Sequence, residues 1–123
     1  MVLTLPNEDG VRSVINPITK AELELVATER FGDMVKAVVD VEKKIMAIGG
    51  DLHADEERLL LENNSAQQNL WGINIYPNEP ADKRVEFDSM INLRPKQNNR
   101  SRNVEDALVR EQITDIINIL VNW

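Results

Sequence analysis

Apolar and polar residues follow two different periods along the chain, and the first clear signal is that of a helix. Leu23 and Val26 recur at helical spacing. Thr19 can cap the helix, and Glu22, three residues later, can complete a capping box. Gly32 is a natural stop signal. The pattern therefore predicts a first helix between Thr19 and Gly32.

The following segment changes to a period of two, which is typical of strands. Residues 35–41 alternate around a row of valines, residues 45–48 resume the apolar pattern, and Gly49-Gly50 close it. A single long helix is the alternative, but the density of β-branched residues favours two strands joined by a tight charged turn. A short strand is also expected over residues 11–15, before Asn16-Pro17.

The second half of the chain predicts two more helices around an antiparallel strand pair. A short helix should begin near His53, with acidic residues in its first turn and leucines 59–61 packing inward. Residues 70–76 and 85–93 are expected to pair as strands. Asn103 can cap a final helix. Its apolar stripe consists of Val109, Ile113, Ile116, Ile117 and Leu120.

This order of elements, β-α-β-β-α-β-β-α, predicts the α+β class. The expected architecture is a two-layer sandwich in which helices on one face cover an antiparallel-rich sheet of about 4–5 strands. We expect a flexible lead-in over residues 1–10 and a single α+β domain over residues 11–123. Strand parity then places the odd-numbered residues under the helices and the even-numbered residues on an open polar face.

Composition and charge narrow the classes of function. The chain has 123 residues, 42% hydrophobic, with no cysteine, which excludes disulfides, thiolate metal sites and a cysteine nucleophile. No apolar run approaches the roughly 20 residues of a membrane helix, so we expect a cytoplasmic protein without membrane contact. The formal net charge of −7 argues against nucleic acid as a partner. The sequence indicates no cofactor.

Residues 83–102 nevertheless carry six basic side chains against two acidic ones. Within this segment Arg94, Arg100 and Arg102 precede a predicted helix, and arginine forks beside free backbone N–H groups suit a phosphate or carboxylate. Asn74, Tyr76 and Asn92 of the polar sheet face could orient such an anion. The alternative is that these arginines pair with carboxylates of the same chain or across a homodimer.

A second candidate cluster surrounds the only histidine of the chain. His53 and Asp55 lie in GGDLHADEE, and Asp40 and Asp88 could perform acid–base work if their strands were neighbours. The ligand spacing matches no established metal signature, and the helix N-terminus can account for the carboxylates. We therefore predict no metal site here.

Three hypotheses follow for the function, which the sequence leaves unknown. The first is a binding domain for an acidic small molecule or acidic protein segment, at the polar face and the loop 94–102. The second is an oligomerising or protein-interaction module without catalysis. The third is a metal- or carboxylate-dependent enzyme that uses the cluster around His53. The sequence favours a binding function over catalysis, but it does not decide among the three hypotheses.

Four blocks of the chain are distinctive: FGDMVKAVVDVEKKIMAIGGDLHADEE (31–57), LWGINIYP (70–77), EFDSMINLRP (86–95) and NRSR (99–102). Together they resemble an uncharacterised prokaryotic family of small stand-alone proteins, a domain of unknown function. The resemblance spans roughly residues 14–121. It implies a small single-domain bacterial or archaeal protein, and it carries no known activity, cofactor or site residue.

Overall fold

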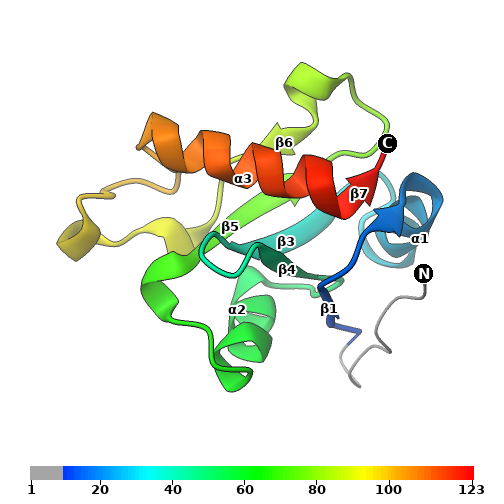
Figure 1. The fold of residues 1–123 in the computed structure, drawn as a ribbon. Helices are drawn as coiled ribbons and strands as arrows, with labels where there is room; N and C mark the ends of the chain where they lie inside the picture. The colour runs from blue at the N-terminus through cyan, green and yellow to red at the C-terminus, as the bar shows by residue number, and fades with distance from the viewer. Residues whose placement is uncertain (1–9) are drawn as a thin grey trace.

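A computed structural model describes residues 10–123, so the predicted lead-in, Gly10 apart, lies outside the described residues. The core of the fold is a five-stranded sheet in which every pair of neighbouring strands is antiparallel (Figure 1). The strand order is β1 (Arg12–Val14), β4 (Ile45–Ile48), β3 (Val35–Asp40), β5 (Leu70–Ile75) and β6 (Val85–Glu86). The predicted α+β class with an antiparallel sheet is therefore confirmed.

Three helices accompany the sheet: α1 (Lys20–Arg30), α2 (His53–Glu62) and α3 (Ala107–Leu120). As predicted, Thr19 caps α1, because its hydroxyl accepts a hydrogen bond of 3.0 Å from the Glu22 N–H. The predicted Asn103 cap of α3 is wrong. The cap is Asp106, whose carboxylate accepts from the Leu108 N–H at 2.8 Å. Within residues 10–123, no helix is long and apolar enough to cross a membrane.

The main core lies between one face of the sheet and the helices α1 and α3. The odd-numbered residues of β3 and β5 point into it, as strand parity predicts. A short parallel pair, β2 (Ile18–Thr19) with β7 (Val121–Asn122), links the start of α1 to the end of α3. The helical residues of this core are Leu23, Val26, Ala27, Ile113, Ile116, Ile117 and Leu120.

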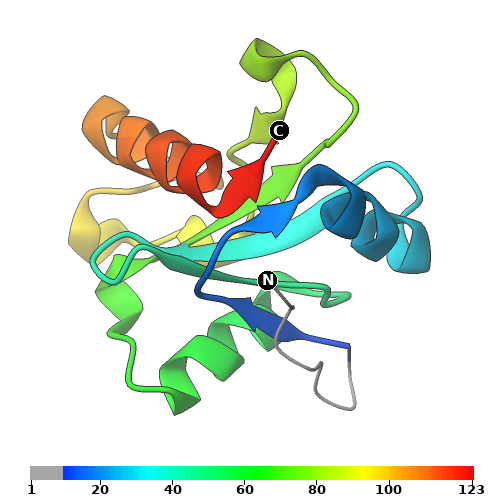
Figure 2. The ribbon, with the colours of Figure 1, turned by 45° about the vertical axis from the view of Figure 1, so that its right-hand side comes forward.

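The expectation that all helices lie on one face needs a correction. Helix α2 lies on the opposite face of the sheet from α1 and α3 (Figure 2). The reason is that the even-numbered positions are not uniformly polar: Val38 and Leu70 are fully buried there, packed with Leu60 of α2. Since apolar strand residues need cover from water, α2 packs over this part of the face.

The predicted strand over residues 85–93 is also shorter than expected, because β6 ends at Glu86. Beyond it the chain turns onto the α2 face and forms a 3₁₀ turn over Met90–Asn92. The Asn92 side chain then forms hydrogen bonds to the backbone of β5 that a neighbouring strand would otherwise form. Its amide oxygen accepts from the Gly72 N–H at 2.8 Å and its amide nitrogen donates to the Gly72 carbonyl at 2.9 Å. Further 3₁₀ turns lie at Gln67–Asn69, Ala81–Lys83 and Pro95–Gln97.

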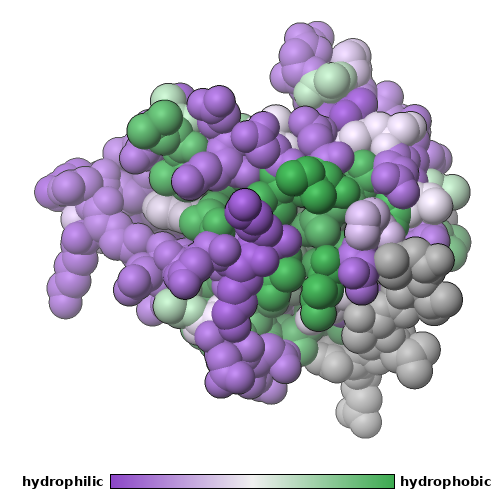
Figure 3. Space-filling model, in the orientation of Figure 1, coloured by the Kyte–Doolittle hydropathy of each residue, from purple (hydrophilic) through white to green (hydrophobic). Residues whose placement is uncertain are grey.

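The surface on the α3 side of the molecule carries an apolar area. In the space-filling view it lies around the C-terminal end of α3 and β7, with hydrophilic side chains around it (Figure 3). Parallel pairing of β2 with β7 brings the residues that precede these strands toward the same end of the pair. These include Ile15 and Ile119, which are 59% and 63% exposed.

Candidate functional site

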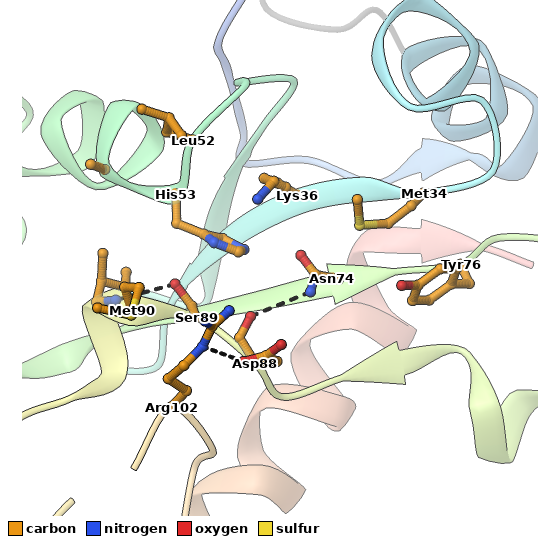
Figure 4. A pocket seen from close by; sticks show the side chains of 12 residues that line it. Met34, Lys36, Leu52, His53, Asn74, Tyr76, Asp88, Ser89, Met90 and Arg102 are labelled. Carbon is orange, nitrogen blue, oxygen red and sulfur yellow. Dashed lines mark hydrogen bonds and ion pairs between the residues drawn. The ribbon is translucent and has the colours of Figure 1, made fainter. Parts of the chain in front are cut away.

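A pocket of about 350 Å³ lies where the N-terminus of α2 meets the C-terminal end of β5. Its walls come from four parts of the chain: β3 and the residue before it, the start of α2, the end of β5, and the loop segments 88–91 and 102. We call it the α2–β5 pocket (Figure 4). It includes Lys36 and Asn74, two polar residues at even-numbered positions of β3 and β5.

Asn74 lies at the floor of the pocket. Hydrogen-bond acceptors on one side fix the orientation of its side chain. Its amide nitrogen donates to the Glu86 carboxylate at 2.8 Å and to the Asp88 carbonyl at 3.3 Å. Its amide oxygen is buried and has no hydrogen-bond partner among the described residues. The neighbouring Tyr76 hydroxyl also donates to Glu86, at 3.3 Å. Burial, and then the Glu86 carboxylate, raise the pKa of Tyr76, so the phenol remains a neutral donor.

His53 is the first residue of α2 and lies almost wholly inside the protein, at 7% exposure. One ring nitrogen, Nε2, lies 2.7 Å from the Ile73 carbonyl oxygen. Because a carbonyl only accepts, Nε2 must carry the hydrogen. Burial lowers the pKa of His53, and the Ile73 carbonyl and the Asn74 side chain only partly offset this effect. The ring is therefore neutral at physiological pH, and its Nδ1 is an acceptor.

Two cations reach the pocket, and they differ in their partners. The Arg102 guanidinium forms an ion pair with the Asp88 carboxylate, with Nε 2.7 Å from Oδ1. Lys36 lies directly across the β3–β5 ladder from Asn74 and is half-buried. Its ammonium lies over the Phe31 ring, 5.5 Å from the ring centre. Among residues 10–123, no carboxylate lies within ion-pair distance of Lys36.

The remaining walls are apolar. Met34, Leu52, Met90 and Ile91 surround the polar floor, and Leu52 and Met90 are among the most exposed large apolar side chains of the protein. The site therefore combines a polar end, where hydrogen bonds and charge are available, with an apolar rim. That combination is typical of sites for small organic molecules.

The pocket brings together members of both clusters that the sequence suggested. Asn74, Tyr76 and Arg102 come from the expected anion site, and His53 and Asp88 come from the second cluster. The two clusters meet because the His53 ring reaches the carbonyl of Ile73, next to Asn74, and because Arg102 pairs with Asp88. The sequence alone does not indicate that these two clusters lie close together.

Arg94 lies outside this pocket and is bound by its own surroundings. Its guanidinium donates to the carbonyls of Ile91 and Gln67, both at 2.9 Å, and to that of Leu70. It also stacks on Trp71, 4.7 Å from the ring centre. Burial lowers the pKa of Arg94. These contacts fasten the loop to the start of β5.

The other two residues of the expected anion site also lie outside the α2–β5 pocket. Asn92 is fully buried and, besides its contacts with Gly72, donates to the Arg102 carbonyl at 3.0 Å. The backbone N–H of Arg100 donates to the Glu105 carboxylate at 2.9 Å, and the Arg100 residue is exposed. Both residues shape the loop that delivers Arg102 to the pocket.

Two members of the second cluster, Asp40 and Asp55, lie outside the pocket and form contacts elsewhere in the fold. Asp40 is buried in the β3–β4 turn, where its carboxylate accepts from two backbone N–H groups and from the Ser65 hydroxyl. It stands four residues along β3 from Lys36, roughly 13 Å away. Asp55 pairs with Arg58 at 2.6 Å. Within the described part of the chain, no group of three histidine or acidic residues is placed to hold a metal ion.

Lys36 and Ser89 are site residues that sequence reasoning did not select. Strand parity put Lys36 on the polar face, but only the register shows that it faces Asn74. Ser89 was expected on the apolar side of a long strand. Because β6 ends early, Ser89 instead packs against Gly72 and lines the pocket. A β-carbon on Gly72 would lie 2.5 Å from the Ser89 side chain, so glycine is required for this close approach.

Comparison with known proteins adds a family but no activity. No curated protein matches the chain, and no solved structure matches it. A family model described as "Protein of unknown function (DUF5674)" matches residues 12–120. This range includes all elements of the five-stranded sheet, the three helices and every residue of the α2–β5 pocket. The chain therefore belongs to the DUF5674 family of proteins of unknown function.

Proposed function

We propose that this protein binds a small organic acid in the α2–β5 pocket, with the acid group at Lys36. The observation that carries the proposal is a lysine without a carboxylate partner among residues 10–123, at the wall of a concave site. The pocket also receives the start of α2, whose cap residue Leu52 offers no side-chain acceptor to the first N–H groups. Such N–H groups favour an anion.

The rest of the pocket suits the remainder of such a ligand. Arg102 uses its Nε–H on Asp88 and has further guanidinium N–H groups that can donate hydrogen bonds, and the apolar rim of Met34, Leu52 and Met90 can cover a hydrocarbon portion. A volume of about 350 Å³ matches a small molecule. An acidic protein segment, the other partner considered from the sequence, would have to place a single side chain there.

Differential scanning fluorimetry with a panel of small carboxylates and organic phosphates tests the proposal. A bound acid at ~100 times its Kd should stabilise the fold by about 2.7 kcal/mol. Lys36→Met, which keeps the apolar stem and removes the charge, should abolish that stabilisation without unfolding the protein. Lys96→Met is the matched control, because Lys96 is exposed and lies outside the pocket.

Two results would contradict the proposal. One is a panel in which no acid stabilises the folded wild-type protein at millimolar concentration. The other is an acid whose effect survives Lys36→Met and disappears in Lys96→Met, since that would locate the site on the loop 94–102. Weakening of the effect by salt is expected in either case and does not discriminate.

A second candidate, self-association, is favoured by a separate observation: the apolar area at the end of α3 (Figure 3). We infer that this area would meet a second copy of the chain, and that Ile119, 63% exposed in the last turn of α3, would lie in the contact. Size-exclusion chromatography with light scattering should then show a dimer that Ile119→Glu converts to a monomer. A monomeric wild-type protein across the micromolar range would reject this candidate and leave the pocket proposal untouched.

A further inference from the structure

The orientation of the Asn74 side chain restricts the chemistry of any ligand in the α2–β5 pocket. Its amide nitrogen faces two groups that only accept hydrogen bonds, the Glu86 carboxylate and the Asp88 carbonyl. Reversing the amide would set its oxygen against both acceptors. The amide oxygen therefore faces the other way, and Figure 4 shows it turned from Asp88 toward the strand that carries Lys36.

Among residues 10–123, this oxygen has no hydrogen-bond partner at full hydrogen-bond distance, although the Asn74 side chain still interacts with the His53 ring. Asn74 is only 7% exposed, and its Oδ1 is buried with no hydrogen-bond partner among the described residues. Buried polar atoms in folded proteins nearly always have a partner, so an exception requires an explanation. A ligand that donates a hydrogen bond at this point would supply one.

The neighbouring polar groups of the pocket are also hydrogen-bond acceptors. The His53 ring uses its hydrogen on the Ile73 carbonyl, which leaves Nδ1 as an acceptor. Asp88 contributes a carboxylate to the wall, and Glu86 lies just behind Asn74. These acceptors would repel a plain anion, whereas Lys36 would attract one. The pocket thus presents hydrogen-bond acceptors at Asn74 and at Asp88, whose charge is shared with the Arg102 guanidinium, and an unpaired positive charge at Lys36 among residues 10–123.

We propose that the natural ligand is a free amino acid with an apolar side chain. Its ammonium group would donate to Asn74 Oδ1 and lie near Asp88, and its carboxylate would meet Lys36. Its side chain would contact Met34, Leu52 and Met90. This inference rests on the proposed function, because it retains the acid group at Lys36 and adds the requirement for a donor beside it.

Matched pairs of ligands test the inference without altering the protein. Isothermal titration calorimetry would compare leucine with 4-methylpentanoate, methionine with 4-(methylthio)butanoate and phenylalanine with 3-phenylpropanoate. Each pair differs only in the amino group. We expect at least one amino acid to bind roughly tenfold more tightly than its deaminated partner, because only the amino acid satisfies the buried acceptor.

A variant locates the effect. Asn74→Ala should reduce the preference for the amino acid toward unity while the deaminated acid still binds. Asn78→Ala, in the exposed turn after β5, is the matched control and should retain the preference. If Asn74→Ala fails to fold, backbone amide shifts of the wild-type protein on titration with the amino acid provide the location. They should cluster at residues 34–36, 53–54, 74–76 and 88–91.

The outcomes separate this inference from the proposed function. Equal affinity within every pair, or tighter binding of the deaminated acids, would overturn the inference and leave the acid site in place. Binding of amino acids that perturbs only amides outside the pocket would overturn it as well. If neither member of any pair bound while another acid required Lys36, only the amino-acid assignment would fall. If no acid bound at all, both proposals would fall together.

Discussion

Glu56 gives the fold a pH dependence that one substitution should remove. This residue of the first turn of α2 is fully buried, and one carboxyl oxygen accepts a hydrogen bond from the Gly50 N–H at 3.0 Å. The other oxygen is buried without a partner among the described residues. Burial raises the pKa of Glu56 well above the ordinary 4.5, and the Gly50 hydrogen bond and the Lys36 charge offset this only in part. The folded protein therefore retains a proton that the unfolded chain releases.

The sign of the effect follows from proton linkage. Between pH 4.5 and the raised pKa of Glu56 in the folded state, the folded state binds one proton more than the unfolded state does at this residue. The contribution of Glu56 to the free energy of unfolding is thus fully present below pH 4.5. It falls by up to about 1.4 kcal/mol for each pH unit above that value, until the pH reaches the raised pKa of the folded state. Glu56→Gln keeps the shape of the neutral acid and has no proton to lose.

Urea unfolding followed by tryptophan fluorescence, repeated from pH 5 to 8, measures this effect. Relative to the wild type, the Glu56→Gln variant should gain stability with rising pH at a slope approaching 1.4 kcal/mol per unit. Glu62→Gln, at the exposed end of the same helix, controls for the loss of one surface charge. If the difference between Glu56→Gln and the wild type stayed constant across this range, Glu56 would not carry a proton in the folded state.

Two further substitutions test how the loop is attached beneath the pocket. Asn92→Ala leaves the Gly72 N–H and carbonyl without partners and should lower the free energy of unfolding by roughly 2–5 kcal/mol; a loss below that of the exposed control Asn78→Ala would contradict this role. Gly72→Ala forces a β-carbon against Ser89 and should cost about 1–3 kcal/mol. Adding Ser89→Gly should recover part of that loss, and strictly additive effects in the double variant would disprove the contact.

Local signals in the sequence were sufficient for most of the elements. The Thr19 cap of α1 and the apolar stripe of α3 depend on residues three or four positions apart, so they can be seen without the fold. The valine-rich alternation of β3 is likewise local, and it correctly placed the odd-numbered residues in the main core. These features depend on the backbone period alone.

The strand after the 77–84 turn shows where local reasoning stops. Residues 85–93 alternate like a strand, yet the ladder ends at Glu86 because the Asn92 side chain occupies the hydrogen-bonding groups of Gly72. A single asparagine side chain that forms these hydrogen bonds in place of a strand leaves no periodic pattern in the sequence. The same early departure moved Ser89 to the pocket and carried Arg94 to the start of β5, away from the site expected for it.

The sequence by itself determined the α+β class, the three helices and the polar residues from which a site could be built. The tertiary structure alone decided which of those residues meet. Lys36, His53, Asn74 and Arg102 are spread over 67 positions of the chain, and they converge because strand register aligns Lys36 with Asn74 while α2 crosses the sheet beside them. Register and helix placement arise from the burial of distant apolar residues such as Leu60 and Leu70. That burial is a property of the whole chain, and no single segment displays it.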